Sequence, residues 1–371
     1  MNRISKKQLL LVALAVSLGW GLRGQHGHER GAAVAGAMAG LSLAAVTGSP
    51  RWMGAAVLGS LGFAIGGSLS YGRFVQPAYQ GSWEAILTLA QAGLAWGGLG
   101  SLGLGLGLNL SRYRVWERVA MAGSLFMVWV VVDHLIWGHL SGPQDLETRR
   151  HMIWVLLAAW VFLSLYVGVL RKDRTSLRLA LAGGAGFGVG FPLAAWAQGT
   201  SSRFGIPLDG WMLGQHLIGL CGGASLAWVA LHQESSWTKP VSVPPWERWL
   251  AVAWLIVFLP SWQIANNLDF WISEQALLPV WMNRVVWSGL FLFLLALAFW
   301  GWYEIRRGRI FVTSWMPRHL RRLFLAFLWI TTLVACSKLY LIGFWSPTPL
   351  GFLFLASAIT LLIRVGRPLS F

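Results

Sequence analysis

The most regular feature of the chain is a series of apolar runs, separated by short polar or basic segments. A transmembrane α-helix needs about 20 consecutive, largely apolar residues. The pattern predicts twelve such helices, at residues 8–24, 31–48, 52–70, 85–110, 119–138, 152–170, 179–197, 211–231, 249–265, 285–302, 323–343 and 348–363. We therefore expect an all-α, polytopic transmembrane helical bundle.

Composition agrees with a chain that lies in a membrane along its whole length. It is 56% hydrophobic and 11% charged, with a mean hydropathy of +0.60, whereas soluble domains carry about 25% charged residues. The basic N-terminus followed by an apolar run is typical of a signal peptide. A small-residue cleavage motif does not follow it, so we interpret this segment as an uncleaved first span.

The charge is strongly basic, with 29 Lys and Arg against 13 Asp and Glu and a net charge of +16. In a soluble protein such a balance indicates nucleic-acid binding. Here most basic residues fall in alternate short loops between apolar runs, where positive charge marks the cytoplasmic side. The pattern disfavours a nucleic-acid partner. It predicts a multi-pass protein of a cell membrane, of the bacterial inner-membrane type, with both termini inside and lipid as a partner.

Glycine and tryptophan divide the chain into two parts. The 44 glycines cluster mainly in predicted spans one to four and seven to eight, where they indicate either close helix packing or a broken helix that lines a cavity. The last spans are rich in Leu, Phe and Trp. We expect a Gly-rich core bundle over residues 1–232 and an accessory bundle over 233–371. Within the latter, residues 249–363 offer a surface for a protein partner.

A weak internal repeat is visible in the core part. Residues 59–67 align with 183–191, and residues 91–102 align with 215–226, both at an offset of 124. Spans three and four thus reappear as spans seven and eight, and because four spans separate them the repeat is parallel. Chance similarity in Gly/Leu-rich sequence is the alternative. Repeats of this kind are common in transporters, with the site at their interface.

Polar chemistry concentrates in residues 19–40, GWGLRGQHGHERGAAVAGAMAG, which fall at the predicted outer face. Ionisable groups at membrane depth are costly and mark functional sites. Arg23, His26 and Arg30 share one helical face, and the N–H groups that begin the second span point to the same place. This combination predicts an anion-binding site to which Gln25 contributes. A polar turn that merely holds the helical hairpin is the alternative.

Other polar residues are expected at the same depth. We assign Gln91, Gln215 and His216 to substrate binding, with hydrogen bonding between helices as the alternative for the glutamines. Lys338 is expected nearby, where a lysine can also extend to the interface. In an enzyme or a proton-coupled carrier, the acid–base groups would be Glu29, His28, Asp133 and His134.

The sequence assigns no cofactor. A metal alternative would join His26, His28 and Glu29 with Asp133, His134 or His139, and a haem alternative would pair His134 with His216. Neither has the spacing of an established motif, and the chain carries no phosphate loop, His-Glu-x-x-His motif or nucleophile elbow. No metal is therefore expected.

Three functions fit these patterns. The first is a secondary transporter or permease for a small anionic solute, which the predicted spans, the repeat and the cationic cluster favour. The second is a membrane-embedded transferase or hydrolase for a lipid-linked substrate. This function is favoured by the location of the predicted polar residues at one face of the membrane. The third is a non-catalytic subunit of a membrane complex. Whether the protein is an enzyme stays open at this point.

Overall fold

The computed structural model describes residues 6–67, 69, 71–130, 146–204, 209–233, 245–274, 317–340 and 347–365, with isolated positions between 279 and 307. Every secondary-structure element in these ranges is helical. The elements are α1 (Lys6–His26), α2 (His28–Thr47), α3 (Trp52–Gly67), α4 (Gly72–Tyr79), α5 (Trp83–Leu108), η1 (Leu110–Arg112), α6 (Val115–Val130), α8 (Leu146–Leu165), η3 (Tyr166–Leu170), α9 (Arg174–Arg203), α10 (Gly210–His232), α11 (Pro245–Ala253), η5 (Trp254–Phe258), α12 (Leu259–Asp269), η6 (Phe270–Glu274), α14 (Pro317–Tyr340) and α15 (Pro347–Val365).

Seven helical segments of the described chain are long and apolar enough to cross a membrane, or eight if the bent pair α3 and α4 forms one span. This is the pattern of a multi-pass membrane protein. Helix α15 contains a shorter apolar stretch, Thr348–Arg364. Of the predicted spans, 285–302, the ends of 119–138 and 323–343, and positions 68 and 70 of span 52–70 lie outside the fully described ranges.

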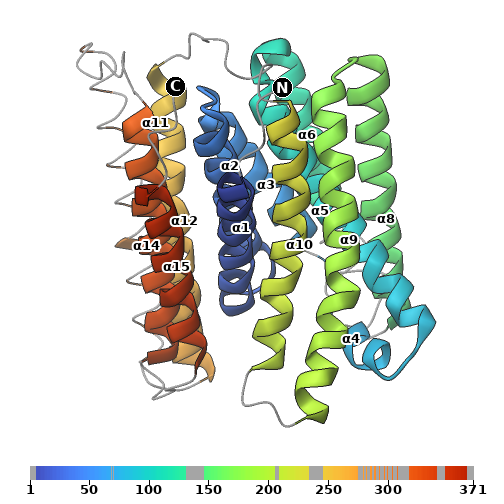
Figure 1. The fold of residues 1–371 in the computed structure, drawn as a ribbon. Helices are drawn as coiled ribbons and strands as arrows, with labels where there is room; N and C mark the ends of the chain where they lie inside the picture. Colours follow the sequence, from blue (N-terminus) through green and yellow to red (C-terminus); the bar gives the residue numbers. More distant parts are fainter. Residues whose placement is uncertain are drawn as a thin grey trace.

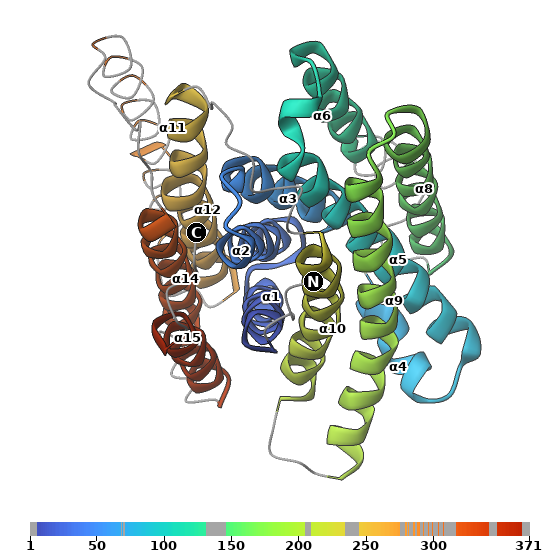
Figure 2. The ribbon, with the colours of Figure 1, turned by 45° about the horizontal axis from the view of Figure 1, so that its top comes forward.

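Six helices form a closed ring in which each packs against the next. The order around the ring is α1, α2, α3, α5, α9 and α10, which returns to α1, and Figure 2 shows this arrangement. Helix α2 is the most enclosed of the candidate spans, with 94% of its apolar window buried, whereas α8 with η3 has only 28% buried. The exposed apolar face of α8, which includes Phe162 and Trp154, suits contact with lipid.

Glycines allow the close approach of neighbouring helices in the ring. A side chain at Gly36 of α2 would collide with the backbone of Gly59 in α3, and one at Gly54 of α3 would collide with Gly107 in α5. Gly97 of α5 faces Gly183 of α9 in the same way. Small residues are the usual means of bringing helices together where lipid supplies no hydrophobic drive. The close-packing interpretation of these glycines is confirmed.

One interruption does occur, between α3 and α4. The two helices bend by 67°, and Tyr71 lies directly before α4. Its side chain is buried, 2% exposed. The bend therefore brings a phenol into the interior at the end of the bundle where α1 ends and α2 begins, which we term the Arg23 end. The opposite end, where α5 ends and α9 begins, is the Asp173 end.

The segment from α11 to η6 runs as a continuous series of helical turns, and α14 and α15 pack against each other beside it. Figure 1 shows this group standing beside α1 and α2, away from α5, α8 and α9. Helix α14 contacts α2, and α15 contacts α1. The C-terminal helices thus lie against the polar stretch that the sequence singled out.

Candidate functional site

Arg23, in the last turn of α1, is buried at the Arg23 end, with 3% of its surface exposed. Its guanidinium carbon lies 4.7 Å from the ring centroid of Trp96, 5.1 Å from that of Tyr71 and 5.9 Å from that of Trp20. Aromatic faces attract a cation, and more strongly when water is excluded. The three rings thus form an aromatic cage for the guanidinium.

Two polar groups complete this cage. Arg23 Nη1 donates to Tyr71 Oη at 3.0 Å and to Gln215 Oε1 at 3.1 Å. Gln215, on α10, in turn donates from Nε2 to Tyr71 Oη at 2.7 Å. The predicted pair Arg23 and Gln215 therefore meets in space across 192 residues of sequence. Tyr71 was missed by sequence reasoning, and its signal was the Gly/Ser-rich break GGSLSYG that interrupts an apolar run.

Next to the cage, on the side that faces the Asp173 end, aromatic side chains fill the middle of the six-helix ring. Trp20 lies 4.8 Å from Phe187 and 5.1 Å from Trp96 between ring centroids, and Phe63 and Phe187 are 5.4 Å apart. All of these side chains are fully buried. In this conformation the ring interior is packed with aromatic side chains.

A second group of cations lies at the junction where α1 ends and α2 begins. Lys338 of α14 donates from Nζ to the carbonyl of Gln25 at 2.6 Å and lies 4.4 Å from the Phe270 ring centroid. A cation at the carbonyl end of a helix is stabilised by the helix dipole. Arg30, in the first turn of α2, lies 3.4 Å from Asp269 Oδ2 of α12. The C-terminal helices therefore contribute charges to the site.

His26 lies between these cations and is 1% exposed. Arg30 and Lys338 act electrostatically on its ring, and the Asn267 side chain makes a weak hydrogen-bond contact with it. Neither ring nitrogen makes a hydrogen bond of good geometry within the described part of the chain. Buried polar groups are normally paired, so this imidazole is available to a ligand or to water.

The other predicted binding residues, Gln25, His216 and Gln91, have side chains that lie outside the Arg23 cage and the group of cations. Gln25 is half-buried and reaches Met212 Sδ at 3.2 Å. The Nδ1 atom of His216 lies 3.1 Å from the Ser17 carbonyl, and its ring packs on Phe352. Gln91 is half-buried on α5 and makes no side-chain hydrogen bond to another described residue. Of the polar residues predicted at this depth, Arg23, His26, Arg30, Gln215 and Lys338 are those whose described side chains contribute to the two clusters.

The predicted acid–base groups are less completely described. Glu29 is half-buried in the first turn of α2. The side chain of His28, and Asp133, His134 and His139 as a whole, lie outside the described residues. Among the residues that the structure describes, no group of three or more His, Cys, Asp or Glu side chains is placed to hold a metal ion. The metal and haem alternatives involve undescribed residues and stay untested.

A polar network that sequence reasoning missed lies at the Asp173 end. Asp173 is fully buried before α9 and accepts hydrogen bonds from Asn109, Tyr113 and Ser176, at 2.9, 2.8 and 2.7 Å. Burial, followed by the charge and hydrogen bond of Asp173, raises the pKa of Tyr113. Because Asp173 also caps α9 through the Ser176 N–H and ties it to the end of α5, we interpret this network as a structural joint.

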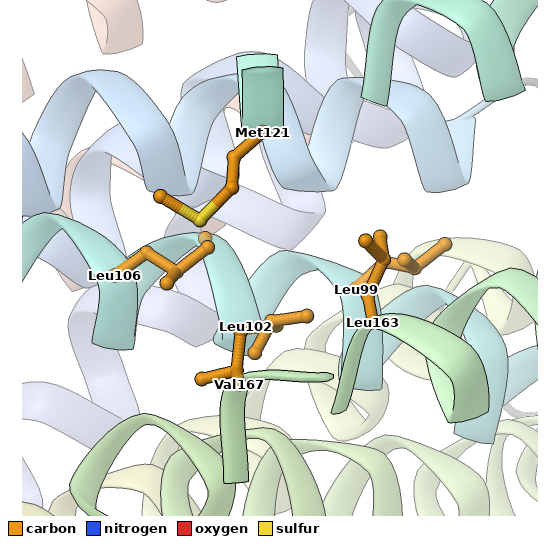
Figure 3. A pocket seen from close by; sticks show the side chains of 7 residues that line it. Leu99, Leu102, Leu106, Met121, Leu163 and Val167 are labelled. Carbon is orange, nitrogen blue, oxygen red and sulfur yellow. The ribbon is translucent and has the colours of Figure 1, made fainter. Parts of the chain in front are cut away.

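The crevice in Figure 3 lies between α5, α6, α8 and η3. It is lined by six apolar side chains and a glycine: Leu99, Leu102, Gly103, Leu106, Met121, Leu163 and Val167. Such a lining offers no hydrogen bond to a charged solute. The polar chemistry described above therefore belongs to the Arg23 end and not to this crevice.

Comparison with known proteins identifies no relative. No protein family, no curated protein and no solved structure matches this chain. The function must be argued from the site itself.

Proposed function

We propose that the protein is a multi-spanning permease for a small anionic solute, which binds at the Arg23 end. The observation that carries the proposal is the meeting of Arg30, Lys338 and buried His26 at the beginning of α2. Arg23 lies one turn before His26 on α1. Free N–H groups at a helix N-terminus and nearby cations favour the same ligand, an anion.

The first-turn geometry of α2 supports this proposal. Its N-cap residue is Gly27, with a φ of 80° and no side-chain cap, so no side chain at that position occupies the first N–H groups. The unpartnered nitrogens of His26 lie directly before this turn. An oxyanion seated there would receive hydrogen bonds from a backbone and an imidazole and charge from Arg30 and Lys338.

The proposed architecture has twelve spans with both termini inside. The orientation is supported by the distribution of charge between the two ends of the bundle, because basic residues are concentrated at the Asp173 end, in the connections from α5 to α6 and from α8 to α9. They include Arg112, Arg114, Arg118, Arg171, Lys172 and Arg174. Positive charge favours the cytoplasmic side. This orientation would turn the Arg23 end to the outside of a bacterial-type inner membrane.

The proposed parallel repeat has support from matched contacts. Gly66 of α3 packs against Trp96 of α5, and its counterpart Gly190 of α9 packs against Ile218 and Cys221 of α10. Likewise Gly62 packs against Leu99 and Gly100, and Gly186 against Cys221 and Ser225. Each pair of contacts follows the offset of 124 to within a few residues. The ring would then place its central aromatic residues between two similar helix pairs, as sites lie between repeats in transporters.

Reconstitution tests the proposal. The purified full chain in sealed liposomes should take up labelled phosphate, sulfate, lactate or propionate, and the double variant Arg23→Ala plus Arg30→Ala should abolish this uptake. The matched control is Arg203→Ala, which removes an exposed cation at the same end of the bundle. Since Arg23 is buried, Arg23→Lys keeps a charge and distinguishes loss of function from loss of fold. Uptake that survives in a folded double variant would contradict the proposal.

A further inference from the structure

Helix α12 presents a polar face to the interior beside the proposed anion site. Gln263 is 0% exposed and Asn267 is 1% exposed. The two residues are four positions apart and therefore lie on one face of the helix. Asn266 is half-buried next to them. A buried amide is destabilising unless its polar atoms are hydrogen-bonded.

Most of these amide atoms have no partner. Within the described part of the chain, both amide atoms of Gln263 and the side-chain oxygens of Asn266 and Asn267 make no hydrogen bond of good geometry, and the Asn267 side chain has only a weak hydrogen-bond contact with the His26 ring. Asn267 does donate from Nδ2 to the Val334 carbonyl at 2.8 Å. This hydrogen bond sets the orientation of the amide, so the atom that points elsewhere is the oxygen. With His26 beside Asn267, the unpartnered atoms gather where α12 meets α1 and α14.

The backbone around this face is also unusual. Two π-helical turns, η5 and η6, directly flank α12 on both sides. A π turn has poorer geometry than an α turn and is found frequently at functional sites. One other π-helical turn, η3, is found in the described chain, so a pair of such turns around the three amide residues is a second observation that distinguishes this segment.

The chemistry of the free atoms defines what they can bind. Three are amide oxygens, which only accept hydrogen bonds, while Gln263 Nε2 and one His26 nitrogen can donate. Arg30 and Lys338 bring two positive charges to the same junction, and Asp269, which pairs with Arg30, brings one negative charge. The excess of positive charge opposes a metal cation on the oxygens. A fully deprotonated oxyanion would satisfy the cations and leave the oxygens unpaired.

We propose that the solute carries its own N–H or O–H donor in addition to its negative charge, and that the Gln263 and Asn267 amides recognise this donor. The inference rests on the proposed function and narrows its substrate class to donor-bearing oxyanions, such as hydroxy acids. The C-terminal helices then take part in recognition, since α12 supplies the amides and α14 the lysine.

The test uses matched pairs of anions that differ in a donor: lactate against propionate, glycolate against acetate, and phosphate against sulfate. Binding to the purified full chain at pH 7 is measured by calorimetry and uptake in liposomes. Within each pair of anions that binds to the protein, the anion with the donor should bind about tenfold more tightly than the anion without it. The donor-free anion leaves the buried amide oxygens without a hydrogen-bond partner. Gln263→Leu should reduce this preference to about twofold while affinity for the donor-free member is kept.

Controls separate the outcomes. Gln8→Leu, at the Asp173 end where Gln8 donates to the Val46 carbonyl, should leave the preference unchanged. Anion binding without preference overturns this inference and leaves the proposed function standing, whereas absence of any anion binding or uptake overturns both. Sodium-dependent binding without preference would assign the amides to a cation instead. A preference that survives in both Gln263→Leu and Asn267→Leu also overturns the inference.

Discussion

Phe63 of α3 and Phe187 of α9 stand 124 residues apart in the sequence, and their rings meet with centroids 5.4 Å apart in the middle of the six-helix ring. Both also contact Trp20 of α1. The two phenylalanines occupy the positions that the sequence alignment matches with each other. Two residues that the proposed repeat pairs are therefore in direct contact at the centre of the bundle.

Truncation of either ring should destabilise the bundle to a similar extent. We expect Phe63→Ala and Phe187→Ala each to cost about 3–5 kcal/mol, the range for large-to-small changes in a packed core. Thermal unfolding in detergent checks this expectation. Phe162→Ala removes a ring that is 71% exposed on α8 and should change stability by less than about 0.5 kcal/mol. Equal effects at Phe162 and Phe187 would contradict the central role of the phenylalanine pair.

The helix seam between α5 and α9 should not tolerate a side chain at Gly97. A Cβ there would meet the Phe187 side chain and the Gly183 carbonyl, so Gly97→Ala must push the helices apart and should cost about 1–3 kcal/mol, as overpacking does. Gly123→Ala on α6 meets nothing and should be neutral or stabilising by up to about 1 kcal/mol. Unfolding midpoints of the two variants, compared in one detergent, decide the question.

Much of the fold followed from the apolar pattern. Long runs without charge predict helices because backbone polar groups in lipid must be satisfied within the segment, and α2, α5, α8, α9, α10, the α11–η6 segment and α14 fulfil this expectation. The bend before α4 and the π turns around α12 were not predicted. The π turns leave the local composition apolar, whereas the bend coincides with the Gly/Ser-rich stretch GGSLSYG. The geometry of both arises from contacts between helices that a one-dimensional pattern does not contain.

The candidate site was predicted in part. Arg23, His26 and Arg30 stand out in sequence because charges are rare in apolar surroundings. Tyr71, Gln263 and Asn267 do not stand out, since uncharged polar residues are common near span ends. Their role depends on burial and on missing hydrogen-bond partners, which only the three-dimensional arrangement reveals.

The Asp173 network should be important for stability. In Asp173→Asn the side chain loses its charge and one of the two acceptor oxygens that Asn109, Tyr113 and Ser176 share, and we expect a loss of about 2–3 kcal/mol. Asp209 also caps a helix, α10, but from an exposed position. Because Asn caps helices as well as Asp, Asp209→Asn should be neutral. Similar losses in the two variants would show that capping alone accounts for Asp173.

The raised pKa of Tyr113 predicts that the folded protein loses stability at alkaline pH. Its pKa is raised above the usual value of 10.0 by burial and by Asp173, so the folded protein keeps the phenol protonated when an unfolded chain would lose the proton. The contribution of this residue is therefore complete below pH 10 and declines as pH rises above it. Denaturation profiles between pH 8 and 11 should fall more steeply for the wild type than for Tyr113→Phe. Parallel profiles would contradict the prediction.

Lys338 should act both as a helix cap and as a source of charge. Lys338→Met removes the donor to the Gln25 carbonyl and should cost about 1 kcal/mol. Anion affinity should fall as well, because one of the three cations near the beginning of α2 is lost. Lys338→Arg keeps the charge and should restore most of the affinity measured by calorimetry. Unchanged affinity in Lys338→Met would restrict this residue to capping.

The π turn η5 has a consequence for the direction in which α12 faces. A π turn holds one residue more than an α turn, and each residue rotates a helix by about 100°. The extra residue in Trp254–Phe258 therefore sets the angular phase of everything that follows it. Deletion of Ile256 would return the segment to α-helical phase and turn Gln263 and Asn267 by about a quarter of a circle away from His26. The direction of the amide face is thus set by a single inserted residue in a mainly apolar segment, whose Trp254 ties it to α3 by donating from Nε1 to Ser60 Oγ at 3.2 Å.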